Sequence, residues 1–168
     1  LAIAATAHQV GLPTNATMLY GHIENPTEKV YHLCRLRDLQ DESGGFLAYI
    51  PLSFHPERTE LEDLPGPSGC LDLKEIAIGR LMLDNFPNIK TFWIMNTIEI
   101  SQTALWYGAN DIDGTIMDYE ITRESFVATR QRLTQQQLLD RIVEAGRIPV
   151  ERDSLYNLVG GAVEEAAG

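Results

Sequence analysis

Short apolar runs alternate with longer helical patterns along this chain, and this alternation limits the folds that it can adopt. The runs 14–20, 46–52 and 91–95 have the length and apolar content of strands, and a weaker run covers 111–117. Because a helical crossover between two strands makes them parallel, the pattern predicts an α/β fold of about four parallel strands with outer helices. The pattern fits both a small doubly wound sheet and half of an eight-stranded barrel.

Start and stop signals bound the predicted helices. Asn25 can cap a helix in which Pro26 takes the first position and Glu28 completes a capping box. This helix is expected to end before Gly44, since glycine is the common residue after a helix. Further helical patterns cover 71–85, 101–107 and 134–146.

The chain begins inside a helical pattern. Residues 1–10 favour helix without any capping residue before them, and Gly11 supplies a stop. We therefore expect 1–10 to be the end of a truncated helix and the chain to be a fragment of a longer protein. Residues 11–146 hold the strand–helix units, and 147–168 are expected to form a C-terminal tail that frays.

Composition argues against several classes of function. The 13 Lys and Arg residues against 24 Asp and Glu residues give a net charge of −11, which disfavours a nucleic-acid partner because phosphates need clustered cations. No apolar run approaches the roughly 20 residues of a membrane span. The two cysteines, Cys34 and Cys70, form neither a metal-ligand cluster nor a disulfide framework. The chain is therefore expected to be soluble and cytoplasmic.

The segment Tyr20-Gly-His-Ile-Glu24 follows the first predicted strand, where functional side chains gather in both architectures. Gly21 lets a main chain approach a ligand closely, and His22 and Glu24 can donate, accept or bind a metal. A tight turn in which backbone amides hold Glu24 explains the same residues equally well.

Later strand ends carry weaker signals. His55 is a candidate base or ligand, although a loop histidine is more often only solvated. Asn96 is polar, and Asp113 and Thr115 lie in a segment that partly matches a calcium loop without its final glutamate. These positions leave open a metal-dependent barrel hydrolase or isomerase. The ligands of such a metal would be His22, Glu24, His55 and Asp113.

Five longer segments are similar to one known family. They are Thr14-Asn-Ala-Thr-Met-Leu-Tyr-Gly-His-Ile-Glu24 and the segments 36–46, 50–56, 80–87 and 108–115. Together they resemble radical S-adenosylmethionine (SAM) enzymes of the futalosine pathway of menaquinone biosynthesis. Within that family the similarity is greatest to the aminofutalosine synthase group, ahead of dehypoxanthine futalosine cyclase and the deazaflavin synthase subunits.

The resemblance implies the C-terminal half of a (β/α)8 TIM-type radical SAM barrel, with 11–146 as strands five to eight and their helices. It implies a transferase that uses SAM and a [4Fe–4S] cluster, takes electrons from flavodoxin or ferredoxin, and adds a 5′-deoxyadenosyl radical to 3-[(1-carboxyvinyl)oxy]benzoate. In this family the cysteines of a Cys-x3-Cys-x2-Cys loop hold the cluster. Neither Cys34 nor Cys70 belongs to such a loop, so we expect this chain alone to be inactive.

The resemblance also assigns residues. The segment from Thr17 to Glu24 is similar to the family's adenine-contacting Gly-x-Ile-x-Gly-x-x-Glu pattern, with Thr17 in place of its first glycine. The expected cofactor-binding residues are Thr17, Tyr20, Gly21 and Glu24. The expected catalytic residues are His22, His55 and Asp113, and the expected substrate-binding residues are Asn96 and Thr115.

Alternatives to the synthase stay open. They are a cyclase-like radical SAM enzyme, the metal-dependent hydrolase or isomerase, and a non-catalytic half-barrel. An open half-barrel would expose strand edges and an apolar interior, so self-association is expected for it.

Overall fold

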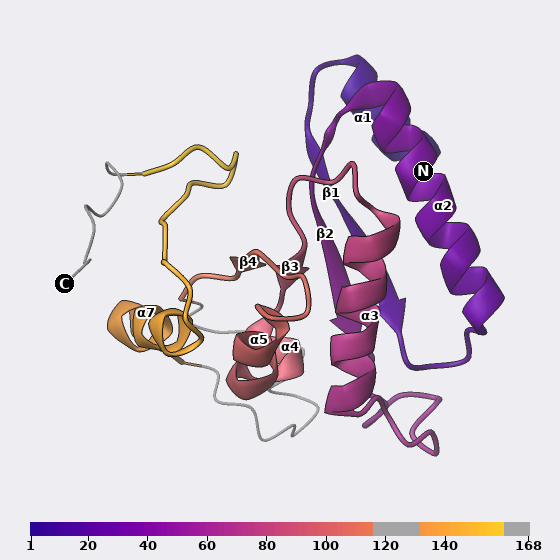
Figure 1. Ribbon diagram of the computed structural model, residues 1–168. Helices are drawn as coiled ribbons and strands as arrows, with labels where there is room; N and C mark the ends of the chain where they lie inside the picture. Colours follow the sequence, from indigo (N-terminus) through magenta and orange to yellow (C-terminus); the bar gives the residue numbers. More distant parts are fainter. Residues whose placement is uncertain (116–131, 160–168) are drawn as a thin grey trace.

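The computed structural model describes residues 1–115 and 132–159 of the 168. Strands and helices alternate as the sequence predicts (Figure 1). The first elements are α1 (Ala2–Gln9), β1 (Thr14–Tyr20), α2 (Pro26–Ser43), β2 (Phe46–Ser53) and α3 (Gly69–Met82). The later elements are β3 (Lys90–Thr91), α4 (Trp93–Asn96), α5 (Ile98–Ala104), β4 (Asp111–Ile112) and α7 (Gln135–Glu144).

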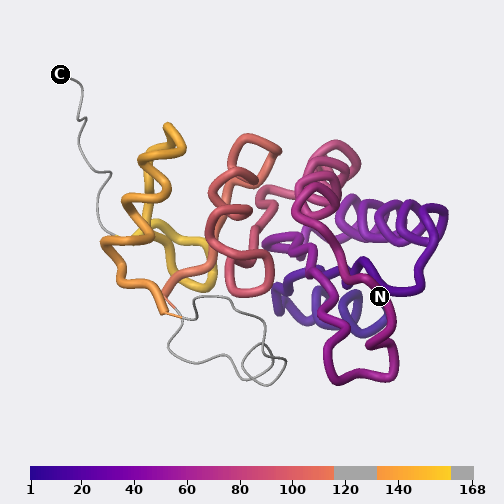
Figure 2. Tube along the Cα trace, turned by 90° about the horizontal axis from the view of Figure 1, so that it is seen from below, coloured from indigo at the N-terminus to yellow at the C-terminus, as the bar shows by residue number. Residues whose placement is uncertain are grey.

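The described strands are parallel and follow one another in chain order. β1 pairs with β2, and β3 pairs with β4. A parallel bridge between Tyr49 and Ile89 joins the two pairs, and the Tyr49 N–H donates to Asn88 O at 2.9 Å. Figure 2 shows the chain advancing across the molecule from α1 and α2 to α7. A sequential order is expected for strands of a (β/α)8 barrel, whereas a doubly wound sheet reverses its order.

One face of the β1–β2 pair packs against helices. Ala16, Met18 and Tyr20 alternate along β1 and are buried in a core that includes Leu33 of α2 and Ile76 of α3. The residues between them in β1 are exposed on the opposite face, which we call the uncovered face. Because the described helices cover one face of this pair, each side chain of β1 belongs either to the core or to the uncovered face.

The capping signals are confirmed. Asn25 Oδ1 accepts the Glu28 N–H at 3.0 Å, and Glu28 Oε2 accepts the Asn25 N–H at 2.9 Å, which is the predicted capping box. Gly44 ends α2 with a φ of +60°, a conformation that favours glycine. Thr134 and Gln137 form a second capping box, at the start of α7.

The strand predicted over 91–95 is wrong in most of its length. The strand β3 covers Lys90–Thr91, and Trp93–Asn96 form the short helix α4, whose four residues are all buried. A short buried apolar run has no polar face, so its periodicity does not separate a strand from a helical turn. The helix predicted over 101–107 also starts earlier, at Ile98, because Thr97 Oγ1 accepts the Ile100 N–H at 3.4 Å.

Other boundaries also differ from the prediction. The helix α3 begins at Gly69 rather than Leu71, since Ser68 Oγ accepts the Leu71 N–H at 3.3 Å and caps it. The strand β4 ends at Ile112, and residues 116–117 of its predicted range lie outside the described residues. Residues 160–168 of the predicted tail also lie outside them. None of the described helices is long and apolar enough to cross a membrane.

Candidate functional site

The turn after β1 is built around Glu24. Its carboxylate accepts the Gly21 N–H at 2.7 Å and the His22 N–H at 2.9 Å. Gly21 has a φ of +87°, and a Cβ there would lie 2.9 Å from the side chain of Pro67, so only glycine fits without strain. The structure therefore shows the turn that the sequence offered as an alternative to a ligand site.

Glu24 is a fixed anion in this turn. Burial raises the pKa of its carboxyl, but the hydrogen bonds from Gly21 and His22 outweigh burial and lower that pKa below its usual value. Lys29 Nζ, from the first turn of α2, lies 3.9 Å from Glu24 Oε1 and also forms an ion pair with the buried Glu75 of α3. The turn is thus tied electrostatically to the two helices that cover the sheet.

The ring of His22 sits between two acceptors. Its Nδ1 lies 3.3 Å from Glu24 Oε2, and its Nε2 lies 3.2 Å from Leu19 O. The ring of Phe54, just beyond β2, contacts it edge-on with a centroid distance of 5.7 Å. The two ring nitrogens of His22 thus face a carboxylate and a main-chain carbonyl at the end of β1.

Thr17 and Tyr20 lie on opposite faces of β1, because side chains alternate along a strand. Thr17 is exposed on the uncovered face. Tyr20 is fully buried on the helix side, and its hydroxyl donates to Asp72 Oδ1 of α3 at 2.6 Å. The sequence grouped both residues at a cofactor surface, but the Tyr20 side chain does not reach the surface that carries Thr17.

Asp72 is the centre of a buried polar network beneath the strand ends. Ser53 Oγ donates to Asp72 Oδ1 at 3.1 Å, and Asn96 Nδ2 donates to the Tyr20 hydroxyl at 3.4 Å. Burial raises the pKa of Asp72, and the hydrogen bonds from Tyr20 and Ser53 offset only part of that effect. The network joins β1, β2, α3 and α4.

Asn96 and His55 meet at this network. Asn96 is buried, and its Oδ1 has no hydrogen-bond partner among the described residues. His55 Nε2 lies 3.0 Å from Met95 O, so the loop after β2 contacts α4 directly. His55 and Asn96 thus both lie beside the Asp72 network, from the loop after β2 and from α4. His22 is linked to this region through its ring contact with Phe54, the residue before His55.

Asp113 belongs to a different set of contacts. Its Oδ1 lies 3.1 Å from Lys90 Nζ of β3, and its main-chain oxygen accepts the indole N–H of Trp93 at 3.1 Å. Burial raises the pKa of Asp113, and the charge of Lys90 offsets part of that rise. Thr115, two residues further, is exposed.

The family described as "CofH/MqnC C-terminal region" matches residues 43–163. This chain belongs to that family. The match covers the loop that carries His55, the segment of Asn96 and the segment of Asp113. The turn around Gly21 and Glu24 lies before the matched range.

Relatives with curated names match nearly the whole chain of this CofH/MqnC family member. An aminodeoxyfutalosine synthase of Thermus thermophilus is 48% identical over 163 residues, which cover 95% of this chain and 44% of that protein. A protein of the same name in Streptomyces coelicolor is 42% identical over 164 residues, covering 91% of this chain and 42% of that protein. The predicted closeness to the aminofutalosine synthase group is confirmed.

More distant relatives have another name. The 5-amino-6-(D-ribitylamino)uracil–L-tyrosine 4-hydroxyphenyl transferase of Methanopyrus kandleri is 37% identical over 162 residues, covering 94% of this chain and 44% of that protein. The chain spans less than half of the length of each of these relatives.

The donors present in this family member do not fit an iron–sulfur cluster. Cys34 and Cys70 are exposed on α2 and α3, and residues 1–115 and 132–159 contain no group of three or more His, Cys, Asp or Glu side chains that could hold a metal. His22, Glu24, His55 and Asp113 are accordingly not assembled as the ligand set that the hydrolase alternative requires.

The sequence missed five residues that organise the site: Asp72, Lys90, Asp111, Arg152 and Tyr156. The predicted strand began at Thr91, one residue after the true start of β3. A prediction that began at Lys90 would have included this lysine in the strand that pairs with Asp111. Arg152 and Tyr156 lie in a segment without periodicity, where no local signal pointed to them.

Proposed function

We propose that the enzyme containing this chain is a radical SAM transferase of the aminofutalosine synthase type. The observation that carries the proposal is the 48% identity over 163 residues to the Thermus thermophilus aminodeoxyfutalosine synthase, against 37% for the Methanopyrus kandleri transferase. In this activity SAM supplies a 5′-deoxyadenosyl group that is added to 3-[(1-carboxyvinyl)oxy]benzoate. We assign no ligand of the [4Fe–4S] cluster to the described residues, since their donors do not fit it.

The proposed cofactor surface consists of Thr17, Gly21 and Glu24. Thr17 presents its side chain on the uncovered face, next to the half-exposed Leu19, so a hydroxyl and an apolar surface are available to a nucleoside. Gly21 keeps the main chain of the turn free of a side chain, and Glu24 holds that turn in place. Tyr20 is left out of this surface and supports the end of β1 from below.

The proposed substrate side consists of His22, His55, Asn96, Asp113 and Thr115. The His22 ring contacts Glu24 and Leu19 O at the end of β1, and an imidazole is a common general acid, so His22 is the proposed proton donor to a reacting oxygen. The Asn96 Oδ1 is an acceptor without a partner among the described residues, which suits a hydroxyl or water that arrives with the substrate. Asp113 and Thr115 provide a carboxylate and a hydroxyl beyond β4.

The test is cofactor binding by the full-length enzyme, reconstituted with its cluster and measured by equilibrium dialysis with labelled SAM. Thr17→Val and Glu24→Gln should each weaken SAM binding about 10-fold, since a lost hydrogen bond or a loosened turn costs about 1 to 2 kcal/mol. Glu28→Gln is the matched control, because glutamine keeps the capping box. Unchanged affinity in both variants would remove the assignment of the cofactor surface.

Product analysis distinguishes between the activities for which the two groups of relatives are named. The enzyme should consume 3-[(1-carboxyvinyl)oxy]benzoate together with SAM and form aminofutalosine. Transfer of a 4-hydroxyphenyl group from L-tyrosine to 5-amino-6-(D-ribitylamino)uracil, without turnover of the benzoate, would contradict the proposal and favour the function named for the Methanopyrus kandleri protein.

A further inference from the structure

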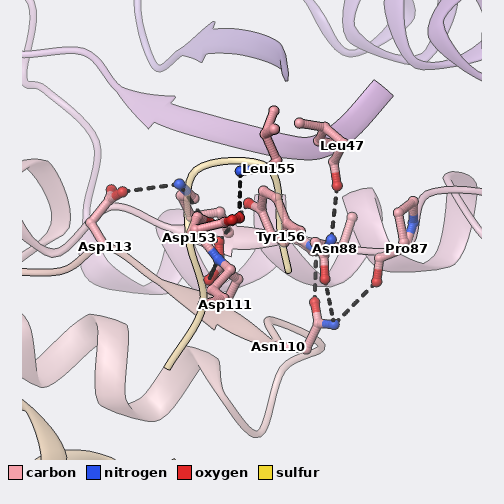
Figure 3. A network of polar contacts seen from close by, with 12 residues as sticks. Leu47, Pro87, Asn88, Asn110, Asp111, Asp113, Asp153, Leu155 and Tyr156 are labelled. Atoms are coloured by element: carbon pink, nitrogen blue, oxygen red, sulfur yellow. Dashed lines mark hydrogen bonds and ion pairs between the residues drawn. The ribbon is translucent and has the colours of Figure 1, made fainter. Parts of the chain in front are cut away.

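A cluster of five polar side chains lies at the β3–β4 pair, and we call it the Lys90 cluster. Its members are Lys90, Asp111, Asp113, Arg152 and Tyr156. Figure 3 labels three of them, Asp111, Asp113 and Tyr156. Lys90 pairs in register with Asp111, so these two side chains share one face of the sheet. The next residue, Thr91, is buried on the other face and contacts Ser101 of α5. The cluster is therefore on the face of the sheet that α5 does not cover.

Within the Lys90 cluster, Asp111 is held mainly by the C-terminal segment. Arg152 donates to both of its oxygens, at 2.9 Å from Nε and 2.7 Å from Nη2, and the Tyr156 hydroxyl donates at 2.7 Å. Lys90 Nζ lies 3.6 Å from Asp111 but 3.1 Å from Asp113. Because Arg152 and Tyr156 already occupy the Asp111 carboxylate, the closer partner of Lys90 is Asp113.

The charges of the Lys90 cluster balance. Two cations face two carboxylates, and burial together with Asp111 raises the pKa of Tyr156, so its hydroxyl stays protonated and donates. A cluster whose cations are already paired offers no free positive charge to an anionic ligand. The cluster is therefore better suited to position one of its own side chains than to bind an anion.

The C-terminal segment is shaped to present Tyr156. Tyr156 has a φ of +66°, which is uncommon for a residue with a side chain. Asp153 maintains this conformation, because its carboxylate accepts the N–H groups of Leu155 at 2.8 Å and Asn157 at 2.9 Å. An antiparallel bridge between Arg152 and Leu158 closes the turn, and the Arg152 guanidinium lies 3.8 Å from the centroid of the Tyr156 ring.

We propose that residues 151–158 act as a clamp that positions Asp113 through Asp111 and Lys90. The inference rests on the proposed function only in giving Asp113 a role toward the substrate. Arg152 and Tyr156 hold Asp111, which leaves the Lys90 ammonium to orient Asp113. Lys90, Arg152 and Tyr156 are thus positioning residues, and the C-terminal segment is part of the site.

The charged groups that act on Asp113 come from three elements. Among the described residues they are Lys90 from β3, Asp111 from β4 and Arg152 from the clamp. Lys90 and Arg152 lower the pKa of Asp113, and Asp111 raises it. Removal of either cation should therefore raise the pKa of Asp113.

The test uses the full-length enzyme and four variants: Lys90→Met, Lys90→Arg, Arg152→Met and Tyr156→Phe. The titration of Asp113 is followed by NMR of 13C-labelled aspartate carboxyls, assigned with Asp113→Asn, and kcat and KM are measured against pH. Lys90→Met should raise the pKa of Asp113 and lower kcat about 10- to 100-fold with KM within about 3-fold, since a misplaced group costs about that much. Lys90→Arg should restore part of the wild-type pKa of Asp113 and part of kcat. Arg152→Met should change the pKa and kcat in the same direction as Lys90→Met, but by less.

Tyr156→Phe keeps the ring over Arg152 and serves as the conservative variant, with a small shift expected in the same direction. Arg141→Met removes an exposed arginine that pairs with Glu144 on α7, so it is the control and should change neither readout. An unchanged Asp113 titration in folded Lys90→Met and Arg152→Met enzymes would overturn the clamp. A shifted titration with unchanged kcat would support the clamp and remove Asp113 from the proposed function.

Discussion

The β1–β2 pair and the β3–β4 pair are both parallel, yet different interactions hold them. β1 and β2 run in register from Asn15 opposite Ala48 to Tyr20 opposite Ser53, and a core of apolar side chains covers one face. In the described part of β3 and β4, the ladder consists of two residue pairs. Where the backbone ladder is short, polar side-chain contacts hold the strands in place instead.

Asn110 and Arg80 supply such contacts next to β4. Asn110 Oδ1 accepts the Ile89 N–H at 2.8 Å, as a strand partner would, and also accepts from Arg80 Nη2 at 2.8 Å. Arg80 Nε donates to Gly108 O at 2.8 Å, so α3 is tied to the loop before β4. The first region should therefore respond mainly to changes of side-chain volume, and the second to changes of single polar groups.

The largest expected effect is a cavity in the first region. Ile76 of α3 is fully buried, and Ile76→Ala should lower the free energy of unfolding by about 2 to 5 kcal/mol, because it removes apolar contacts and leaves a void. Urea unfolding followed by circular dichroism measures the change. Leu81→Ala, on the same helix but 78% exposed, should stay within about 0.5 kcal/mol. Equal effects in the two variants would mean that α3 does not pack as described.

A smaller effect is expected at the Tyr20 hydroxyl, a polar group buried in the first region. Tyr20→Phe removes the donor to Asp72 and the acceptor for Asn96 Nδ2, which should cost about 1 to 3 kcal/mol near neutral pH. The Tyr20 hydrogen bond lowers the pKa of Asp72, so it stabilises the ionised carboxylate more than the protonated acid. The loss should therefore be larger above the raised pKa of Asp72 than below its ordinary value.

Urea unfolding of the wild-type and variant proteins at several pH values checks this dependence. In the wild-type protein, burial raises the pKa of Asp72 above its ordinary value. The stability that the folded protein gains from protonation of Asp72 is therefore complete below the ordinary pKa and is lost as pH rises through the raised one. Tyr31→Phe, on the exposed side of α2, is the matched control and should show no pH-dependent difference. A Tyr20→Phe cost that is the same at all pH values would contradict an ionised Asp72 as the partner.

Local signals account for the elements that the sequence predicted correctly. The capping box at Asn25 and the glycine at 44 fix the ends of α2 through contacts between residues a few positions apart. The strands β1 and β2 have apolar patterns flanked by turn residues, so their ranges also follow from nearby residues. The run 92–95 lacked such a signal, because a buried segment shows no polar face, and its prediction as strand was wrong.

The site could be predicted only as a region. Their positions after strands predicted one common region for His22, His55 and Asn96, because parallel strands end at one edge. The pairings that organise the site join distant residues, such as Tyr20 with Asp72 and Asp111 with Arg152, which are 52 and 41 positions apart. Such pairs depend on how the elements pack, and no spacing in the chain reveals them.

The smallest expected effect concerns the capping box, which occurs at the start of both α2 and α7. Asn25 and Thr134 each cap a helix with the same two hydrogen bonds, and replacing either by alanine should weaken its helix by about 1 kcal/mol. The two helices differ in burial, since α2 buries four residues whereas α7 buries Leu138. Asn25→Ala should therefore lower the global free energy of unfolding, because α2 unfolds with the core.

Thr134→Ala should instead act locally. Because α7 contributes little to the core, loss of its cap should speed amide hydrogen exchange within 135–144 about 5-fold, with a smaller change in global stability. Hydrogen-exchange mass spectrometry on both variants measures the difference. A uniform increase of exchange across β1, β2 and α7 in Thr134→Ala would show that the two regions unfold as one cooperative unit. The contrast between apolar and polar regions would then describe their contacts but not their stability.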